Sequence, residues 1–207
     1  MIKAGELEIQ RRYIVFRVGV ADVLNRRKKM CEESIVIRRA VEKDIDAVES
    51  HYTELLTFEK EHGSHTNWQL GVYPTRRVAQ NGVENGTLYV MEENGELCAS
   101  MLLNQVQLES YASIPWLYEA EPDKVLVIHT LCVPPSHAGK GAGTRMVQFA
   151  LEEAARRGCK VMRLDTWENN EPAANMYRRL GFRYAGKASV LFENAISENL
   201  IFFEKHI

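Results

Sequence analysis

The stretch "SHAGKGAGT", residues 136–144, decides the fold assignment of this 207-residue chain, because its three glycines and two alanines stand directly before a helical pattern. It follows "KVLVIHTLCV" (124–133), the most strand-like run in the chain, which ends at two prolines. Beyond it, apolar residues recur at helical spacing: Met146, Val147, Ala150, Leu151, Ala154 and Ala155. Glycine and alanine at a helix start leave room for an anion to reach the backbone N–H groups. A flexible turn has the same composition, and it is the alternative interpretation.

Two common phosphate-binding loops do not fit this stretch. A nucleotide P-loop requires Ser or Thr after Gly-Lys, whereas here Gly141 follows Lys140. A dinucleotide-binding fingerprint requires Gly-x-Gly-x-x-Gly, and its last position falls on Thr144 or Met146. Neither nucleotide class is therefore supported.

The stretch resembles the pyrophosphate-binding loop of the GNAT superfamily, the acetyl-CoA-dependent N-acetyltransferases. That motif is Gln or Arg, two residues, Gly, one residue, then Gly or Ala, and Gly141 and Gly143 match its glycines. Ala138 stands where Gln or Arg is usual, which removes one polar side chain but leaves the backbone donors in place. The resemblance implies acetyl-CoA as the cofactor, with coenzyme A as product.

A second segment, "LDTWENNEPAANMYRRLGF" (164–182), resembles a later signature of the same superfamily. The matching residues are Asn170, Ala173, Tyr177 and the triplet Leu180-Gly181-Phe182. Tyr177 lies seven residues after Asn170, about two helical turns, so both side chains can face one groove. An ordinary buried tyrosine is the alternative for Tyr177. Two motifs in the expected order extend the resemblance over roughly residues 35–207.

The order of elements predicts an α/β fold: a GNAT-type mixed, mostly antiparallel central sheet with flanking helices and one parallel crossover. We expect a strand at 35–40, a helix ending at Gly63, a short helix after Pro74 and a hairpin around Asn94-Gly95. Residues 35–207 form the predicted acetyltransferase domain. Residues 1–34 carry eight Lys or Arg against five Asp or Glu and form a predicted basic extension of unknown role.

The resemblance implies direct acetyl transfer from the thioester to a bound amine. Tyr177 would give a proton to the leaving thiolate, and His129 would take the amine's proton from a strand position where many relatives carry glutamate. A core or surface histidine, or a water chain acting as base, stays open. Nothing in the sequence activates Cys132 as a nucleophile, and no ligand pair joins His62 and His65 in a metal site.

The expected cofactor-binding residues combine strand, loop and helix positions. Backbone N–H groups of the strand would bind the oxyanion and the pantetheine arm, and those of the loop would bind the phosphates. The full set is Leu131, Cys132, Val133, Ala138, Gly139, Lys140, Gly141, Ala142, Gly143, Thr144, Asn170, Ala173 and Tyr177.

Aromatic residues predict the acceptor site, because cations bind well over aromatic faces. Trp68, Tyr73 and Trp116 are the expected substrate residues, in segments 65–75 and 111–123, although some of these rings can simply cover the sheet. Small-molecule amines and peptide amines both stay open as acceptors.

The composition excludes several classes of function. A net charge of −2 gives no basic field for nucleic acid, and no apolar stretch is long enough to span a membrane. Four cysteines lie far apart in no disulfide framework, which favours a cytoplasmic protein. A catalytically silent coenzyme A sensor is the alternative function, and a homodimer is an open expectation.

Overall fold

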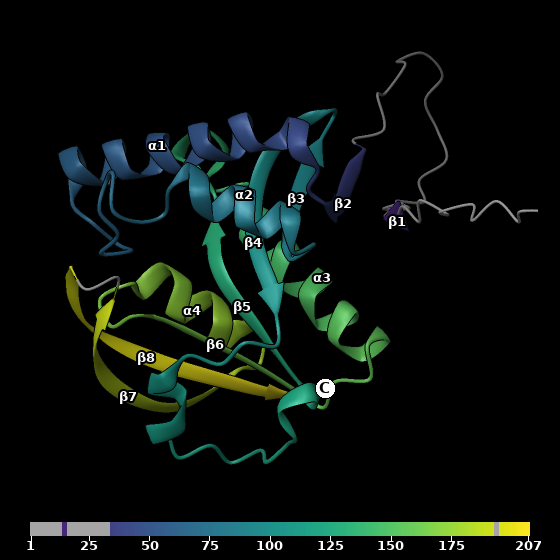
Figure 1. The fold of residues 1–207 in the computed structure, drawn as a ribbon, viewed down its shortest axis with the longest axis vertical. Coiled ribbons are helices and arrows are strands. Elements are labelled where there is room, and N and C mark those ends of the chain that lie inside the picture. Colours follow the sequence, from purple (N-terminus) through teal and green to yellow (C-terminus); the bar gives the residue numbers. More distant parts are fainter. Residues whose placement is uncertain (1–13, 16–33, 193–194) are drawn as a thin grey trace, which may run out of the picture.

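The computed structural model describes residues 14–15, 34–192 and 195–207, which form a mixed sheet with helices on both faces (Figure 1). The eight strands are ordered β1-β2-β3-β4-β5-β6-β8-β7. Their bounds are β1 (Ile14–Val15), β2 (Ile35–Arg39), β3 (Leu88–Glu93), β4 (Glu96–Asn104), β5 (Val125–Cys132), β6 (Val161–Trp167), β7 (Arg183–Phe192) and β8 (Ile196–His206). Within these residues only the β5–β6 pair is parallel, so the predicted fold class is confirmed.

Four α-helices accompany the sheet: α1 (Ile45–His62), α2 (Arg76–Glu84), α3 (Ala142–Arg156) and α4 (Glu171–Arg179). Short 3-10 helices lie at Glu42–Asp44, Glu109–Ser113, Pro122–Lys124 and Pro135–His137. The predicted hairpin is present, because Asn94 and Gly95 adopt positive φ angles of 54° and 86° between β3 and β4. No described helix has the length and apolar character that crossing a membrane requires.

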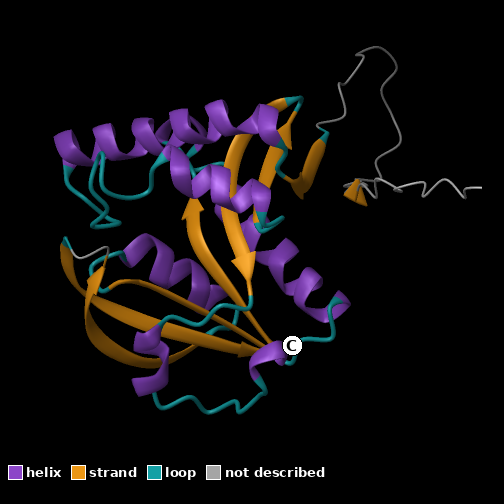
Figure 2. Cartoon of the chain, viewed as in Figure 1, coloured by secondary structure: helices purple, strands orange, loops and turns teal. Residues whose placement is uncertain are grey.

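Side-chain alternation along the strands divides the core between the two faces of the sheet. In β3, Leu88 and Val90 pack with residues of α1 and α2, whereas Tyr89 and Met91 pack with residues of α3. α1 and α2 therefore cover one face, and α3 and α4 cover the other (Figure 2). The predicted basic extension, residues 1–34, lies outside the described residues except for Ser34 and for β1, which pairs antiparallel with β2.

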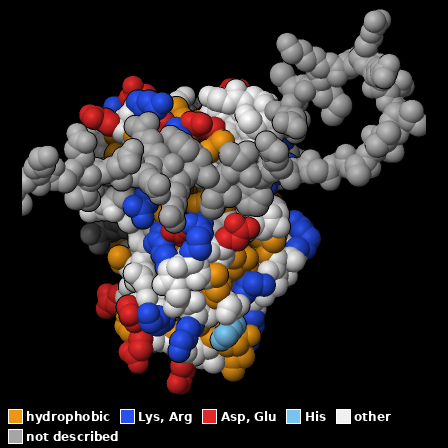
Figure 3. All heavy atoms as spheres, turned by 90° about the vertical axis from the view of Figure 1, so that its right-hand side faces the viewer, with side chains coloured by type: hydrophobic (Ala, Val, Ile, Leu, Met, Phe, Trp, Pro, Cys, Tyr) orange, Lys and Arg blue, Asp and Glu red, His pale blue; other side chains and the backbone are white. Residues whose placement is uncertain are grey.

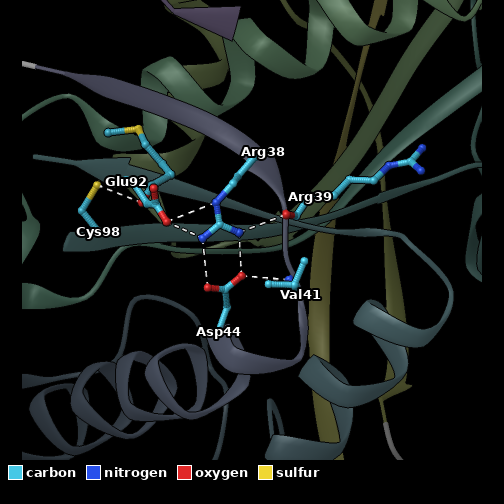
Figure 4. Close-up of polar contacts among 7 residues, drawn as sticks. Arg38, Arg39, Val41, Asp44, Glu92 and Cys98 are labelled. Atoms are coloured by element: carbon cyan, nitrogen blue, oxygen red, sulfur yellow. Dashed lines mark hydrogen bonds and ion pairs between the residues drawn. The ribbon is translucent and has the colours of Figure 1, made fainter. Parts of the chain in front are cut away.

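An arginine joins the start of α1 to strands β2 and β3 of the sheet (Figure 4). The Arg38 guanidinium donates to both carboxylate oxygens of Asp44, at 2.6 and 3.0 Å, and also to Glu92 of β3. Asp44 is 3% exposed and also accepts from the Val41 N–H at 2.8 Å. This paired charge fixes where the chain leaves β2 and enters α1.

The segment between β4 and β5 covers the sheet face that α1 and α2 leave open. Glu204 of β8 is fully buried and accepts hydrogen bonds from the N–H groups of Leu117 and Tyr118, at 2.9 and 3.2 Å. Trp116 packs beside Phe202 and under the Arg163 guanidinium, 4.2 Å from the ring centre. On the outer surface in Figure 3, basic, acidic and apolar side chains are interspersed.

Candidate active site

The cleft forms where β5 and β6 separate. Their parallel pairing ends at Ile128 and Leu164, although β5 continues to Cys132 and β6 to Trp167 (Figure 1). A bulge adds one residue to β5 opposite β4, and Thr130 there has a φ of 49°, a strained value for a β-branched residue. A cavity of about 690 Å³ fills the opening and extends between α1 and α4.

The glycine stretch supplies the edge of the cleft beside α3. Gly139 and Gly141 have φ angles of 78° and 82°, which turn the backbone sharply into the helix. Within the described part of the chain, the N–H groups of residues 139–144 donate to no protein acceptor. A row of free N–H groups at the positive end of a 15-residue helix suits a phosphate group, and a flexible turn does not require it.

α4 forms the adjoining wall of the cleft. Asn170 is its N-cap, and its side chain accepts from the Ala173 N–H at 3.2 Å. Pro172 lies in the first turn, and Gly181 follows the end with a φ of 82°. These signals fix the phase of the helix, so Ala173, Met176 and Tyr177 all line the cleft.

Tyr177 projects from α4 into the cleft and is only 4% exposed. Its ring packs against Phe182 and Phe203, which hold its direction. Burial, and then the nearby Asp165 carboxylate, raise the pKa of the phenol well above its ordinary value, so it carries its proton at neutral pH. Among the described residues the hydroxyl has no hydrogen-bond partner, which leaves its proton available to a bound molecule.

His129 also lines the cleft, on the sheet face opposite α4. Its Nε2 lies 3.1 Å from the Val106 carbonyl oxygen, which orients the ring and assigns the proton of the neutral form to Nε2. Burial lowers the pKa of His129, so at neutral pH the imidazole is uncharged and Nδ1 can accept a proton.

Two of the three predicted substrate residues lie in the cleft. Trp68 and Tyr73 come from the segment after α1, with their ring centres 5.7 Å apart at an edge-on angle, and the Tyr73 hydroxyl hydrogen-bonds to Thr130. Trp116 is instead part of the sheet cover and does not line the cleft.

The predicted cofactor residues fall into two groups. Most of them line the cleft: Leu131, Val133, Ala138, Gly139, Gly141, Ala142, Gly143, Thr144, Asn170, Ala173 and Tyr177. Lys140 and Cys132 do not line it. The Cys132 thiol is fully buried in the core under α1, and burial strongly raises its pKa, which removes any role as a nucleophile.

Three carboxylates line the cleft that sequence reasoning did not single out: Glu59 of α1, Asp165 of β6 and Glu198 of β8. Burial raises the pKa of Asp165 to about 6, although the Tyr111 hydroxyl donates to its Oδ2 at 2.6 Å. The one available signal was the position of Asp165 near the end of the apolar run "KVMRLDTW" (160–167), because ligand-binding residues gather at strand ends in α/β sheets.

Comparison with known proteins assigns the family. The model of the acetyltransferase (GNAT) family matches residues 46–182, about two thirds of the chain, including both motifs. The chain belongs to the GNAT acetyltransferase family. Among its curated relatives, the streptothricin acetyltransferase of Streptomyces lavendulae is 37% identical over 73 residues, which are 35% of this chain and 39% of that protein. Two further curated relatives are matched over 30% and 43% of their length, so the chain spans less than half of each of these three proteins.

Solved structures share the GNAT fold over most of this chain. A GNAT acetyltransferase from Listeria monocytogenes superposes with a TM-score of 0.65 at 21% identity, covering 86% of this chain and 97% of that one. The Salmonella typhimurium protein yncA, solved with its cofactor acetyl-CoA, has a TM-score of 0.58 at 20% identity, over 83% of this chain and 93% of that one. At these identities the likeness concerns the fold alone.

Proposed function

We propose that this GNAT-family chain transfers the acetyl group of acetyl-CoA directly to the amine of a small molecule or peptide. One observation carries the proposal: the free N–H groups of residues 139–144 open into the same cleft as the unpartnered Tyr177 hydroxyl. The first feature suits a pyrophosphate and the second suits a leaving thiolate. A site that only bound coenzyme A would have no use for the second.

The loop before α3 and the end of β5 suit two different parts of the cofactor. The backbone of 139–144 would hold the diphosphate, and the part of β5 beyond Ile128, which no longer pairs with β6, offers backbone to the pantetheine arm. Acetyl-CoA supplies the thioester carbonyl when bound. Bound in the opening between β5 and β6, that thioester would lie in the cleft that His129 and Tyr177 both line.

The proton balance assigns a role to each of these two residues. An acceptor arrives as an ammonium ion, because a free alkylamine has a pKa of about 10, and it gives one proton to Nδ1 of His129. The neutral nitrogen then forms the C–N bond as the C–S bond breaks. Tyr177 gives its proton to the departing sulfur and regains one from the nitrogen, so one proton leaves through His129 for each acetyl group transferred.

Replacing the phenol by phenyl tests the proposal. Tyr177→Phe should lower kcat about 100-fold or more, the usual contribution of a positioned acid, while the Kd for coenzyme A changes less than about twofold. Tyr184→Phe is the control, because Tyr184 is an exposed tyrosine on β7 outside the cleft. Release of free thiol with a panel of amines measures kcat, and calorimetry measures Kd.

Two outcomes would reject the proposal. Coenzyme A binding without acetylation of any amine would favour a silent sensor of the same fold. Equal loss of turnover and coenzyme A affinity in Tyr177→Phe would make Tyr177 a binding residue and not the acid.

A further inference from the structure

The three cleft carboxylates share one property that the proposed reaction does not use. Glu59, Asp165 and Glu198 form no ion pair with any Lys or Arg in the part of the chain that the structure describes. Burying an uncompensated charge is expensive, so carboxylates in a cavity normally have a cationic partner. We call these three residues the acidic wall.

Neutral donors orient each member of the acidic wall. Glu198 accepts from the Asn67 amide at 3.2 Å, and Glu59 accepts from the Thr66 hydroxyl at 2.6 Å and the Ser64 hydroxyl at 2.8 Å. These donors come from the segment between α1 and α2, which in Figure 1 descends from α1 towards the start of β8. These hydrogen bonds fix the directions of the Glu59 and Glu198 carboxylates.

Asp165 lies one residue beyond the last β5–β6 pair, where the two strands separate. Tyr111 holds its Oδ2, whereas its Oδ1 has no hydrogen bond among the described residues. Burial raises the pKa of both Tyr177 and Glu198, and the Asp165 charge raises both further, although the hydrogen bond from Asn67 opposes the rise at Glu198. Tyr177 of α4 lines the same cavity as Asp165. Its side chain is 4% exposed, and its hydroxyl has no hydrogen-bond partner among the described residues.

Basic side chains are nearly absent from this cavity. Among its described lining residues the single Lys or Arg is Arg179, which is exposed in the last turn of α4. The α1 side carries the acidic wall together with the rings of Trp68 and Tyr73. Carboxylates and aromatic faces both attract cations, and the acidic wall would repel a carboxylate on an acceptor bound at the α1 side.

From this arrangement, and resting on the proposed acetyl transfer, we infer that the acceptor is a diamine or polyamine-like dication without a carboxylate beside its amines. Asp165, which lines the same cavity as Tyr177, holds the reacting ammonium. Glu198 of β8 and Glu59 of α1 bind a second positive charge. The acidic wall is thereby the specificity determinant, excluding free amino acids by repulsion from their carboxylate.

A matched set of acceptors tests the inference on the unmodified full chain. Cadaverine, lysinamide and lysine share the same amine-bearing chain but carry no carboxylate, a neutral amide and a carboxylate respectively. We expect kcat/KM for cadaverine and for lysinamide to exceed that for lysine by about tenfold or more, the scale of one unfavourable charge contact. The advantage should shrink as salt is raised, because screening weakens it.

Two variants locate the effect in the acidic wall. Glu198→Gln and Asp165→Asn should each reduce the ratio of lysinamide to lysine kcat/KM by about threefold or more, with coenzyme A affinity unchanged. Glu152→Gln removes the same charge from the exposed surface of α3, outside the cleft, and should leave the ratio unchanged.

The outcomes separate this inference from the proposed function. If lysine is acetylated as well as lysinamide, or better, the inference is wrong while acetyl transfer stands. If coenzyme A binds but none of the three amines or any other amine is acetylated, the proposed function itself fails.

Discussion

Gly143 of α3 and Met176 of α4 lie so close that a Cβ on Gly143 would stand 3.3 Å from the Met176 sulfur. The second glycine of the Gly-x-Gly pair therefore serves helix packing, whereas Gly141 serves the backbone turn with its φ of 82°. Because Tyr177 follows Met176, this contact also sets the distance between the phosphate loop and the phenol.

Gly143→Val should lower both stability and turnover. Overpacking at this contact costs about 1–3 kcal/mol and displaces α4, so kcat falls more than coenzyme A affinity. Thermal unfolding and thiol-release kinetics measure the two effects. Met176→Ala in the same chain opens space and should restore part of both losses; equal losses with and without Met176 would show that the contact is unimportant.

Gly141→Ala should weaken coenzyme A binding through backbone strain. A side chain at this φ costs about 1–2 kcal/mol and turns the N–H groups of the loop away from the diphosphate. Gly158→Ala is the control, because Gly158 has a φ of 68° with open space around it at the far end of α3. Both variants should lose similar stability, and only Gly141→Ala should lose affinity by calorimetry. An equal loss of affinity in both would contradict the assigned phosphate site.

The pH dependence of kcat/KM should reflect Asp165. Its pKa, raised by burial to about 6, means that the carboxylate needed to hold an ammonium is lost as pH falls through 6, well above the ordinary value for aspartate. Burial lowers the pKa of His129, so its loss as a base occurs at lower pH than usual. Activity should be constant above pH 7, and Asp165→Asn should move its acidic limb to lower pH. If the acidic limb of the pH profile stays at the same pH in Asp165→Asn, a group other than Asp165 causes it.

The same raised pKa has a consequence for folding stability. A carboxyl group whose folded pKa exceeds its unfolded value favours the folded state while protonated, and this contribution is lost as pH rises from about 4 to 6. The free energy of unfolding of Asp165→Asn, relative to that of the unmodified chain, should therefore increase as the pH is raised from 4 to 7. Denaturant unfolding at both pH values measures the difference, and Glu152→Gln should show none.

Arg38→Met should destabilise the fold because it leaves Asp44 buried without its partner. Breaking a buried pair on one side costs about 3 kcal/mol, and Asp44 is 3% exposed. Arg76→Met is the matched control, since Arg76 pairs with Asp46 and Glu49 at the surface and its loss should change stability little. Urea unfolding compares the two; equal effects would show that burial does not decide the contribution of these pairs.

Local signals in the sequence determined most of the secondary structure. Backbone preferences of a few neighbouring residues set the hairpin at Asn94-Gly95, the end of α1 at Gly63 and the start of α4 at Asn170–Pro172. Such preferences can be recognised from the sequence alone. The glycine stretch and Tyr177 could likewise be found, because each is part of a short contiguous motif.

Only the tertiary structure decided the rest of the candidate site. Glu59, Asp165 and Glu198 lie on three elements far apart in the chain and meet because β5 and β6 separate after Ile128 and Leu164. Trp116 had the same local character as Trp68, yet the buried Glu204 draws its segment over the sheet and away from the cleft. Which aromatic or acidic side chains face a cavity depends on long-range packing, and no local pattern encodes that.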